Sequence, residues 1–213
     1  MIENNVSLDL MEFIETNVLP RYANFDKAHN LFHVTRVINK SLTLSRQIGT
    51  DINMCYTIAA YHDLGLEGPR AVHHITGGKI IASDVRLRKW FSAEQIKIMK
   101  EAIEDHRASA SHAPRSIYGK IVAEADRVID GETIIRRTIQ FGFTHYASLD
   151  REAHIKRAVE HLREKYGRGG YLKLWIPWSD NATRLNALQE MIADDSAVYR
   201  EIVRIYDLLQ GEA

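Results

Sequence analysis

Residues 52–66 read INMCYTIAAYHDLGL and end a regular apolar pattern with two polar residues. Cys55, Ile58 and His62 are spaced by three and four residues, as on one face of an α-helix. His62 is therefore expected to end the buried face of this helix, and Asp63 follows it directly. Imidazole and carboxylate groups that face a protein interior are costly unless they are paired or bind a metal. The end of this predicted helix is therefore a candidate site.

Three other predicted helices also carry a histidine or an aspartate among apolar residues. A single inward histidine is usually a hydrogen-bonded core residue, and a His-Asp pair by itself is weak evidence, since about 0.6 such pairs are expected by chance in a chain of this composition. Four helices with the same feature together indicate a shared site. The polar residues and their apolar neighbours are His33 with Val37, His106 with Ile103, and Asp126 with Val122 and Ile129.

The whole chain is predicted to be one all-helical domain, residues 1–213. Only 4 prolines and 12 glycines interrupt the sequence, and the intervals between them carry apolar residues at helical spacing rather than the alternation of strands. Asp51, Asp180 and the pair Ser92 and Gln95 are candidate N-terminal caps, and Gly49 and Gly65 are candidate stops. We expect helices at 6–19, 33–48, 52–64, 72–88, 93–107, 116–130, 131–140, 150–166 and 181–209.

The composition of the chain indicates which binding partners and which cellular compartment to expect. Lys plus Arg and Asp plus Glu both total 28, so no net field favours nucleic acid or an acidic membrane, and we expect neither as a partner. The single cysteine, Cys55, lies in an apolar pattern and is read as a core residue, which suits a reducing compartment. The N-terminus lacks a signal-peptide pattern and no apolar run is long enough to span a membrane. These features predict a cytoplasmic protein.

Three motifs resemble those of the HD superfamily of metal-dependent phosphohydrolases. The motifs are HNLFHVTRV at 29–37, AAYHDLGL at 59–66 and AEADRVID at 123–130. The resemblance implies an all-α bundle of the HD-domain type, with a metal-binding core over about 29–131 and C-terminal helices over about 150–209 packed on it. Carried over by position, the residues that resemble the metal ligands are His33, His62, Asp63 and Asp126.

Two further histidines match positions that vary among these enzymes. HHITGGK at 73–79 selects His73 over His74, and EDHRAS at 104–109 contains His106. They could hold a second metal, or they could orient water or bind phosphate beside a single metal. The second interpretation is preferred, and the two-metal site stays open.

Imidazole and carboxylate ligands without thiolate favour Mn²⁺, Fe²⁺, Co²⁺, Ni²⁺ or Mg²⁺, and no organic cofactor is expected. Open metal positions suit hydrolysis of a small phosphate ester or anhydride, and the resemblance favours a nucleotide substrate. The residues expected to act in catalysis are Asp63, His106 and Glu67, and those expected to bind substrate are Arg70, His73, Arg127 and Asp130.

Several alternatives stay open at this stage. Glu67 is also explained as a solvated loop residue, and Asp130 as the N-cap of the helix that begins near Gly131. The segment 167–178, GRGGYLKLWIPW, is either a loop packed on the core or a lid. A homodimer could form through the long helix at 181–209. The competing functions are a di-iron oxygenase of the HD fold and a non-catalytic metal-binding regulatory module.

Overall fold

The computed structural model describes residues 5–26, 28–110 and 112–211, and within these ranges every regular element is helical. The predicted all-α class is confirmed. The chain folds as two compact units, Met1–Arg127 and Val128–Ala213. Each unit has its own hydrophobic core. The expectation of a single domain stays a prediction.

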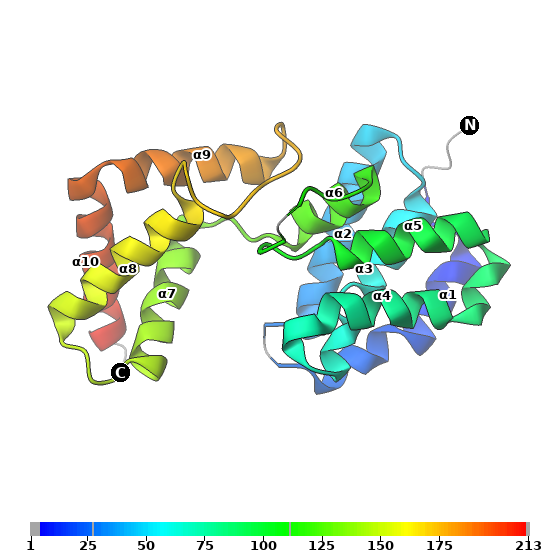
Figure 1. Ribbon diagram of the computed structural model, residues 1–213, viewed down its shortest axis with the longest axis horizontal. Helices are drawn as coiled ribbons and strands as arrows, with labels where there is room; N and C mark the ends of the chain where they lie inside the picture. The colour runs from blue at the N-terminus through cyan, green and yellow to red at the C-terminus, as the bar shows by residue number, and fades with distance from the viewer. Residues whose placement is uncertain (1–4, 27, 111, 212–213) are drawn as a thin grey trace. The chain divides into compact units, whose positions relative to one another are not determined.

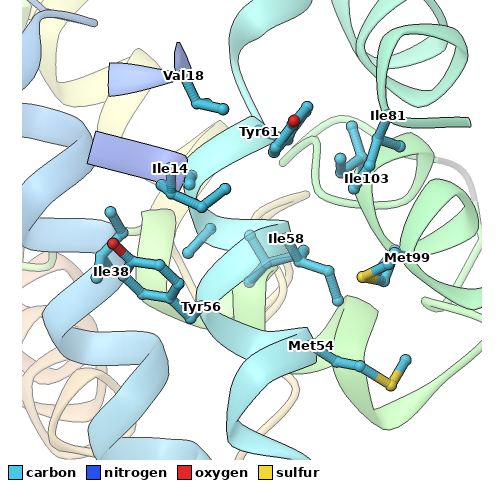
Figure 2. Close-up of a cluster of buried hydrophobic side chains, with 14 of the residues drawn as sticks. Ile14, Val18, Ile38, Met54, Tyr56, Ile58, Tyr61, Ile81, Met99 and Ile103 are labelled. Carbon is cyan, nitrogen blue, oxygen red and sulfur yellow. The ribbon is translucent and has the colours of Figure 1, made fainter. Parts of the chain in front are cut away.

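The first unit is built around one short, buried helix (Figure 1). That helix, α3, is almost wholly apolar and packs against α1, α2, α5 and α6. Figure 2 shows side chains of several helices that meet in this core, among them Ile14, Ile38, Ile58, Ile81 and Met99. The α-helices of the unit are α1 (Leu8–Asn17), α2 (Leu31–Ile48), α3 (Ile52–Tyr61), α4 (His73–Ser83), α5 (Ala93–Glu104) and α6 (Ile117–Asp126). Its 3₁₀ segments are η1 (Leu19–Asn24), η2 (Leu64–Glu67), η3 (Arg70–Val72) and η4 (Val85–Lys89).

Several predicted helix ends are confirmed. The Asp51 side chain accepts hydrogen bonds from the backbone N–H groups at the start of α3, and Ser92 and Gln95 form a reciprocal capping box on α5. Gly49 ends α2 in the left-handed region with φ 79°, where glycine has no steric penalty. Gly49 and Asp51 together fix the short turn that joins α2 to α3.

Other boundaries were wrong. The predicted helix at 181–209 is two helices, α9 (Asp180–Ala193) and α10 (Asp195–Gly211), because the backbone is extended at Asp194. The cap of α9 is Ser179, not Asp180. The predicted helix at 72–88 ends at Ser83 and continues as a 3₁₀ turn.

Gly65 was predicted to stop a helix, but α3 ends earlier, at Tyr61. The glycine instead allows a close approach of two backbones. A Cβ atom at position 65 would lie 1.8 Å from the carbonyl oxygen of His73 and 2.6 Å from the backbone nitrogen of Gly77. Real Cβ contacts are not this short, so only glycine lets α4 pack directly on the segment that follows Asp63.

The second unit contains α7 (Gly131–His145), α8 (Arg151–Tyr166), α9 and α10. Their apolar faces form a separate core that includes Ile135, Ala158 and Ile202. The irregular segment 167–178 contributes Leu172 to this core, as its packing interpretation predicted, whereas Trp178 is exposed. None of the helices in the described ranges is both long enough and apolar enough to span a membrane.

Candidate metal centre

The end of α3 directs two adjacent side chains to one point. Neighbouring residues within an α-helix point about 100° apart, but Asp63 has left the helical conformation, with φ −104° and ψ 3°. Nε2 of His62 therefore lies 3.2 Å from Oδ2 of Asp63. Both side chains are buried, so the tight turn after α3 produces a paired imidazole and carboxylate inside the unit.

Two other helices bring the remaining predicted ligands to this pair. His33 lies in the first turn of α2, where the Asn30 cap accepts a hydrogen bond from its backbone N–H. Its Nε2 atom is 3.2 Å from Nε2 of His62 and 3.4 Å from Oδ2 of Asp63. Asp126, the last residue of α6, places Oδ1 3.3 Å from Nε2 of His33. The fold thus gathers His33, His62, Asp63 and Asp126, which we call the first donor group.

A second donor group shares Asp63 with the first. Nε2 of His73, at the start of α4, lies 3.7 Å from Oδ1 of Asp63, and Nε2 of His106, just after α5, lies 3.6 Å from the same oxygen. The two imidazole nitrogens are 3.3 Å apart. Of the histidine doublet, His73 reaches the site. The two oxygens of Asp63 therefore face different sets of imidazoles.

Backbone carbonyls orient three of the four rings in the same way. Nδ1 of His62, His73 and His106 lies 2.7, 2.8 and 2.6 Å from the carbonyl oxygen three residues earlier. A carbonyl only accepts, so each Nδ1 carries the proton and donates it, leaving a lone pair on each Nε2. Two such lone pairs 3.3 Å apart, on His73 and His106, repel unless a proton or a metal cation lies between them.

These donor atoms fit divalent metals. Ligand atoms about 2.0–2.2 Å from a metal lie about 3.0–3.5 Å from one another, and the distances within both groups are close to that range. In each group, three donor atoms lie within 4.8 Å of one another. The first group could be completed by Asp126, and the second consists of Asp63, His73 and His106.

His33 differs from the other histidines in its outer neighbour. Its Nδ1 lies 3.2 Å from a guanidinium nitrogen of Arg36, which also donates to the backbone carbonyl of Asp126 at 3.4 Å. Arginine only donates hydrogen bonds. The signal for this contact in the sequence is spacing alone, because Arg36 lies three residues after His33 on one helix face.

The charges at the site alter its protonation. Burial opposes the charged form of His33, but Asp126 and Asp63 outweigh it and raise the pKa of His33 to about 9. Burial, together with the neighbouring His106, lowers the pKa of His73 to about 4. Burial also opposes ionisation of Asp63, yet His62, His106 and His33 hold its pKa well below the usual range. Both carboxylates of the first group are thus ionised at neutral pH.

Arg127 contacts one residue of each donor group, Asp126 and His106. One guanidinium nitrogen lies 2.8 Å from Oδ2 of Asp126, and another donates to the backbone carbonyl of His106 at 2.8 Å. The side chain is only 7% exposed. This arrangement orients Asp126 through the oxygen that does not face His33.

The other predicted site residues have different surroundings. Glu67 forms a two-pronged ion pair with Arg21 at 2.6–2.7 Å. Arg70 is 67% exposed and makes long contacts, both 3.4 Å, with Asp26 and His29. Asp130 belongs to the second unit, where its side chain caps α7 through the backbone N–H of Thr133.

The family model of the HD domain matches residues 31–130, the part of the chain that supplies every residue of both donor groups. This segment, somewhat less than half of the chain, is similar to HD domains. HD domains bind divalent metals, and both donor groups in this segment could hold them.

Two other comparisons add little to this assignment. A crystal structure of a predicted HD superfamily hydrolase from an uncultured Thermotogales bacterium is similar, with 23% identity over 71% of this chain and 82% of that chain and a TM-score of 0.48. At that level, the similarity carries no information on activity. No curated protein matched the sequence.

Proposed function

We propose that this HD-domain chain is a metal-dependent phosphohydrolase that acts on a small phosphate ester or anhydride. The observation that carries the proposal is the position of Asp63, whose two carboxylate oxygens face two separate imidazole groups. A site of this kind has donors for two divalent ions, so a two-metal centre is now the favoured arrangement over a single metal.

The proposed metal ligands suit the metals that catalyse phosphate hydrolysis. His33, His62, Asp63 and Asp126 would hold one metal, and Asp63, His73 and His106 would hold the other. Imidazole and carboxylate donors without thiolate suit Mn²⁺, Fe²⁺, Co²⁺, Ni²⁺ or Mg²⁺. Divalent metals in such a site lower the pKa of water and polarise a phosphoryl oxygen, which is the chemistry that phosphate hydrolysis needs.

Cationic side chains near the donor groups supply positions for a phosphate. Arg70 is exposed and its contacts with Asp26 and His29 are long, so its guanidinium is available to turn toward a substrate oxygen. Arg36 lies beside His33. Arg127 is buried against Asp126, and we propose that it positions this ligand instead of contacting substrate.

The nucleotide preference rests on the family resemblance and belongs to the same proposal, as do a cytoplasmic location and a possible homodimer. Asp63 and His106 keep their proposed places in the reacting centre. Glu67 is a weaker candidate for the general base, because its carboxylate is already engaged by Arg21. Asp130 is accounted for as a helix cap.

The test is release of phosphate or pyrophosphate from a panel of nucleotides with Mn²⁺, Co²⁺, Ni²⁺ or Mg²⁺ added. We expect metal-dependent release that Asp63→Ala abolishes and that His112→Gln, a substitution of an exposed histidine, leaves unchanged. Circular dichroism confirms that each variant is folded. Folded, metal-loaded protein that releases neither product would overturn the proposal, and iron-dependent oxygen consumption by the same protein would favour the oxygenase.

A further inference from the structure

A pocket in the second unit, separate from the metal centre, has an unusual balance of charge. It has a volume of about 430 Å³, within the range of roughly 300–1,000 Å³ typical of small-molecule sites. Among the described residues, its lining includes the three cations Arg137, Arg157 and Lys165, together with His161, and no carboxylate. The chain as a whole has no net charge, so this local excess points to an anionic ligand.

Helical spacing produces the cationic wall. Arg157, His161 and Lys165 follow one another at intervals of four residues on α8, so they lie about 6 Å apart along one face. Arg137 lines the pocket from α7, the helix that packs against α8. Groups spaced in this way on two adjacent helices can surround one phosphate with several donors.

Among the described residues, no carboxylate forms an ion pair with Arg157 in the wall of the pocket. A guanidinium nitrogen donates to the backbone carbonyl of Thr138, and its Nε is buried with no hydrogen-bond partner within the described part of the chain. Gly142 makes room for this group, because a Cβ atom there would lie 2.6 Å from an Arg157 nitrogen. The residue as a whole is half-buried, and a partly desolvated cation without a carboxylate carries a cost that a bound anion would offset.

The same pocket exposes two aromatic rings. Phe141 and Tyr146 both line it and are 50% and 47% exposed. Their ring centroids are 6.2 Å apart. Phe141 stacks on His145 with ring centroids 3.9 Å apart, and the Arg157 guanidinium lies over the Tyr146 ring. A base would therefore use the exposed part of Phe141 that His145 does not cover. Exposed aromatic rings beside cations are the features with which proteins stack a nucleobase and bind its phosphate.

We propose that this pocket between α7 and α8 binds a nucleotide, with the phosphate on Arg137 and Arg157 and the base against Phe141. The site lies wholly within Val128–Ala213 and requires neither donor group of the metal centre. The inference is therefore independent of the hydrolase proposal. It assigns a ligand-binding role to α7 and α8, which lie outside the three motifs.

The test is isothermal titration of the full chain with AMP in EDTA, which removes divalent metals. Adenosine and inorganic phosphate, added separately as competitors, each represent half of the ligand. We expect AMP to bind more tightly than either competitor. Arg137→Gln is expected to weaken AMP binding about tenfold or more by removing a charged hydrogen-bond donor, and Phe141→Ala about fivefold or more by removing the stacking surface.

Matched variants separate the pocket from other sites. Arg200→Gln makes the same chemical change on the exposed face of α10, and we expect wild-type affinity from it. Asp63→Ala is also expected to bind AMP normally. Gly142→Ala tests the pocket without removing a charge, since it displaces the Arg157 guanidinium, and should weaken binding. Wild-type AMP affinity in both Arg137→Gln and Phe141→Ala, no AMP binding in EDTA, or loss of binding in Asp63→Ala would overturn the inference.

Discussion

Nε2 of His73 lies 3.3 Å from Nε2 of His106, while the Nδ1 atoms of both rings face backbone carbonyls of their own turns. The two rings thus present unprotonated nitrogens to each other beside Oδ1 of Asp63. A proton on one ring or a metal cation between the nitrogens stabilises such a pair, and metal binding at the second donor group is testable apart from the first.

His106→Gln is expected to remove one metal and leave the other. The first donor group does not contain His106, so binding of the first ion should persist while the second is lost or weakened about 10- to 100-fold. Titration with Mn²⁺, with metal content measured by mass spectrometry, distinguishes the two stoichiometries. His112→Gln is the control. Two tightly bound ions in the variant would contradict the assignment of His106 as a ligand.

Arg127→Met is expected to destabilise the first unit by about 2–4 kcal/mol. Removing one partner of a buried ion pair leaves the other charge uncompensated, and the figure is reduced because the Asp126 side chain is 22% exposed. Urea denaturation gives the difference in the free energy of unfolding. Arg21→Met removes an arginine whose pair with Glu67 is far more exposed, so its cost should stay within about 1 kcal/mol. Equal effects of the two substitutions would contradict the positioning role of Arg127.

Gly65→Ala is expected to cost about 3 kcal/mol and to reduce metal binding at the second donor group. The added methyl group would meet the backbone of His73 and Gly77, which cannot turn aside as a side chain can. Gly169→Ala is the control, because a Cβ atom there has no neighbour within 4 Å. Thermal melts and Mn²⁺ titration of both variants give the comparison, and wild-type stability in Gly65→Ala would refute the close approach of α4.

His154 is expected to make the second unit sensitive to acid. In the unfolded chain an imidazole gains a proton near pH 6.5, whereas burial and the nearby Arg157 lower the pKa of His154 in the folded unit. Below about pH 6.5 the unfolded state therefore binds more protons, and the free energy of unfolding falls as pH falls. His154→Leu should reduce this fall, measured by urea denaturation at pH 8 and pH 5. An unchanged difference between the two pH values would contradict the expectation.

The sequence predicted which residues of the first unit meet, because polar residues on apolar faces of helices are rare enough to be informative. His33, His62, Asp63 and Asp126 stand out in this way, and the fold brings them together. His106 follows the same rule. Their assignment as metal ligands is still a prediction, whereas their proximity is observed.

Other features of the structure could not be predicted from the pattern of polar and apolar residues. The approach of α4 to Gly65 depends on the packing of two distant backbones, and a glycine near a helix end is more simply interpreted as a stop. The basic pocket was missed because Arg137, Arg157 and Lys165 look like ordinary surface residues until α7 and α8 are paired. The interruption at Asp194 was missed for a related reason, since apolar spacing continues across it.

The carbonyl acceptors behind His62, His73 and His106 have an evolutionary consequence. In many metal sites, the partners that orient histidine ligands are carboxylate side chains, which a single mutation can remove. Here the partners are main-chain atoms that every amino acid carries. Substitution of the residues that carry these carbonyls therefore leaves the acceptors of the three rings in place. The surrounding sequence can change during evolution while the orientation of these histidine rings is kept.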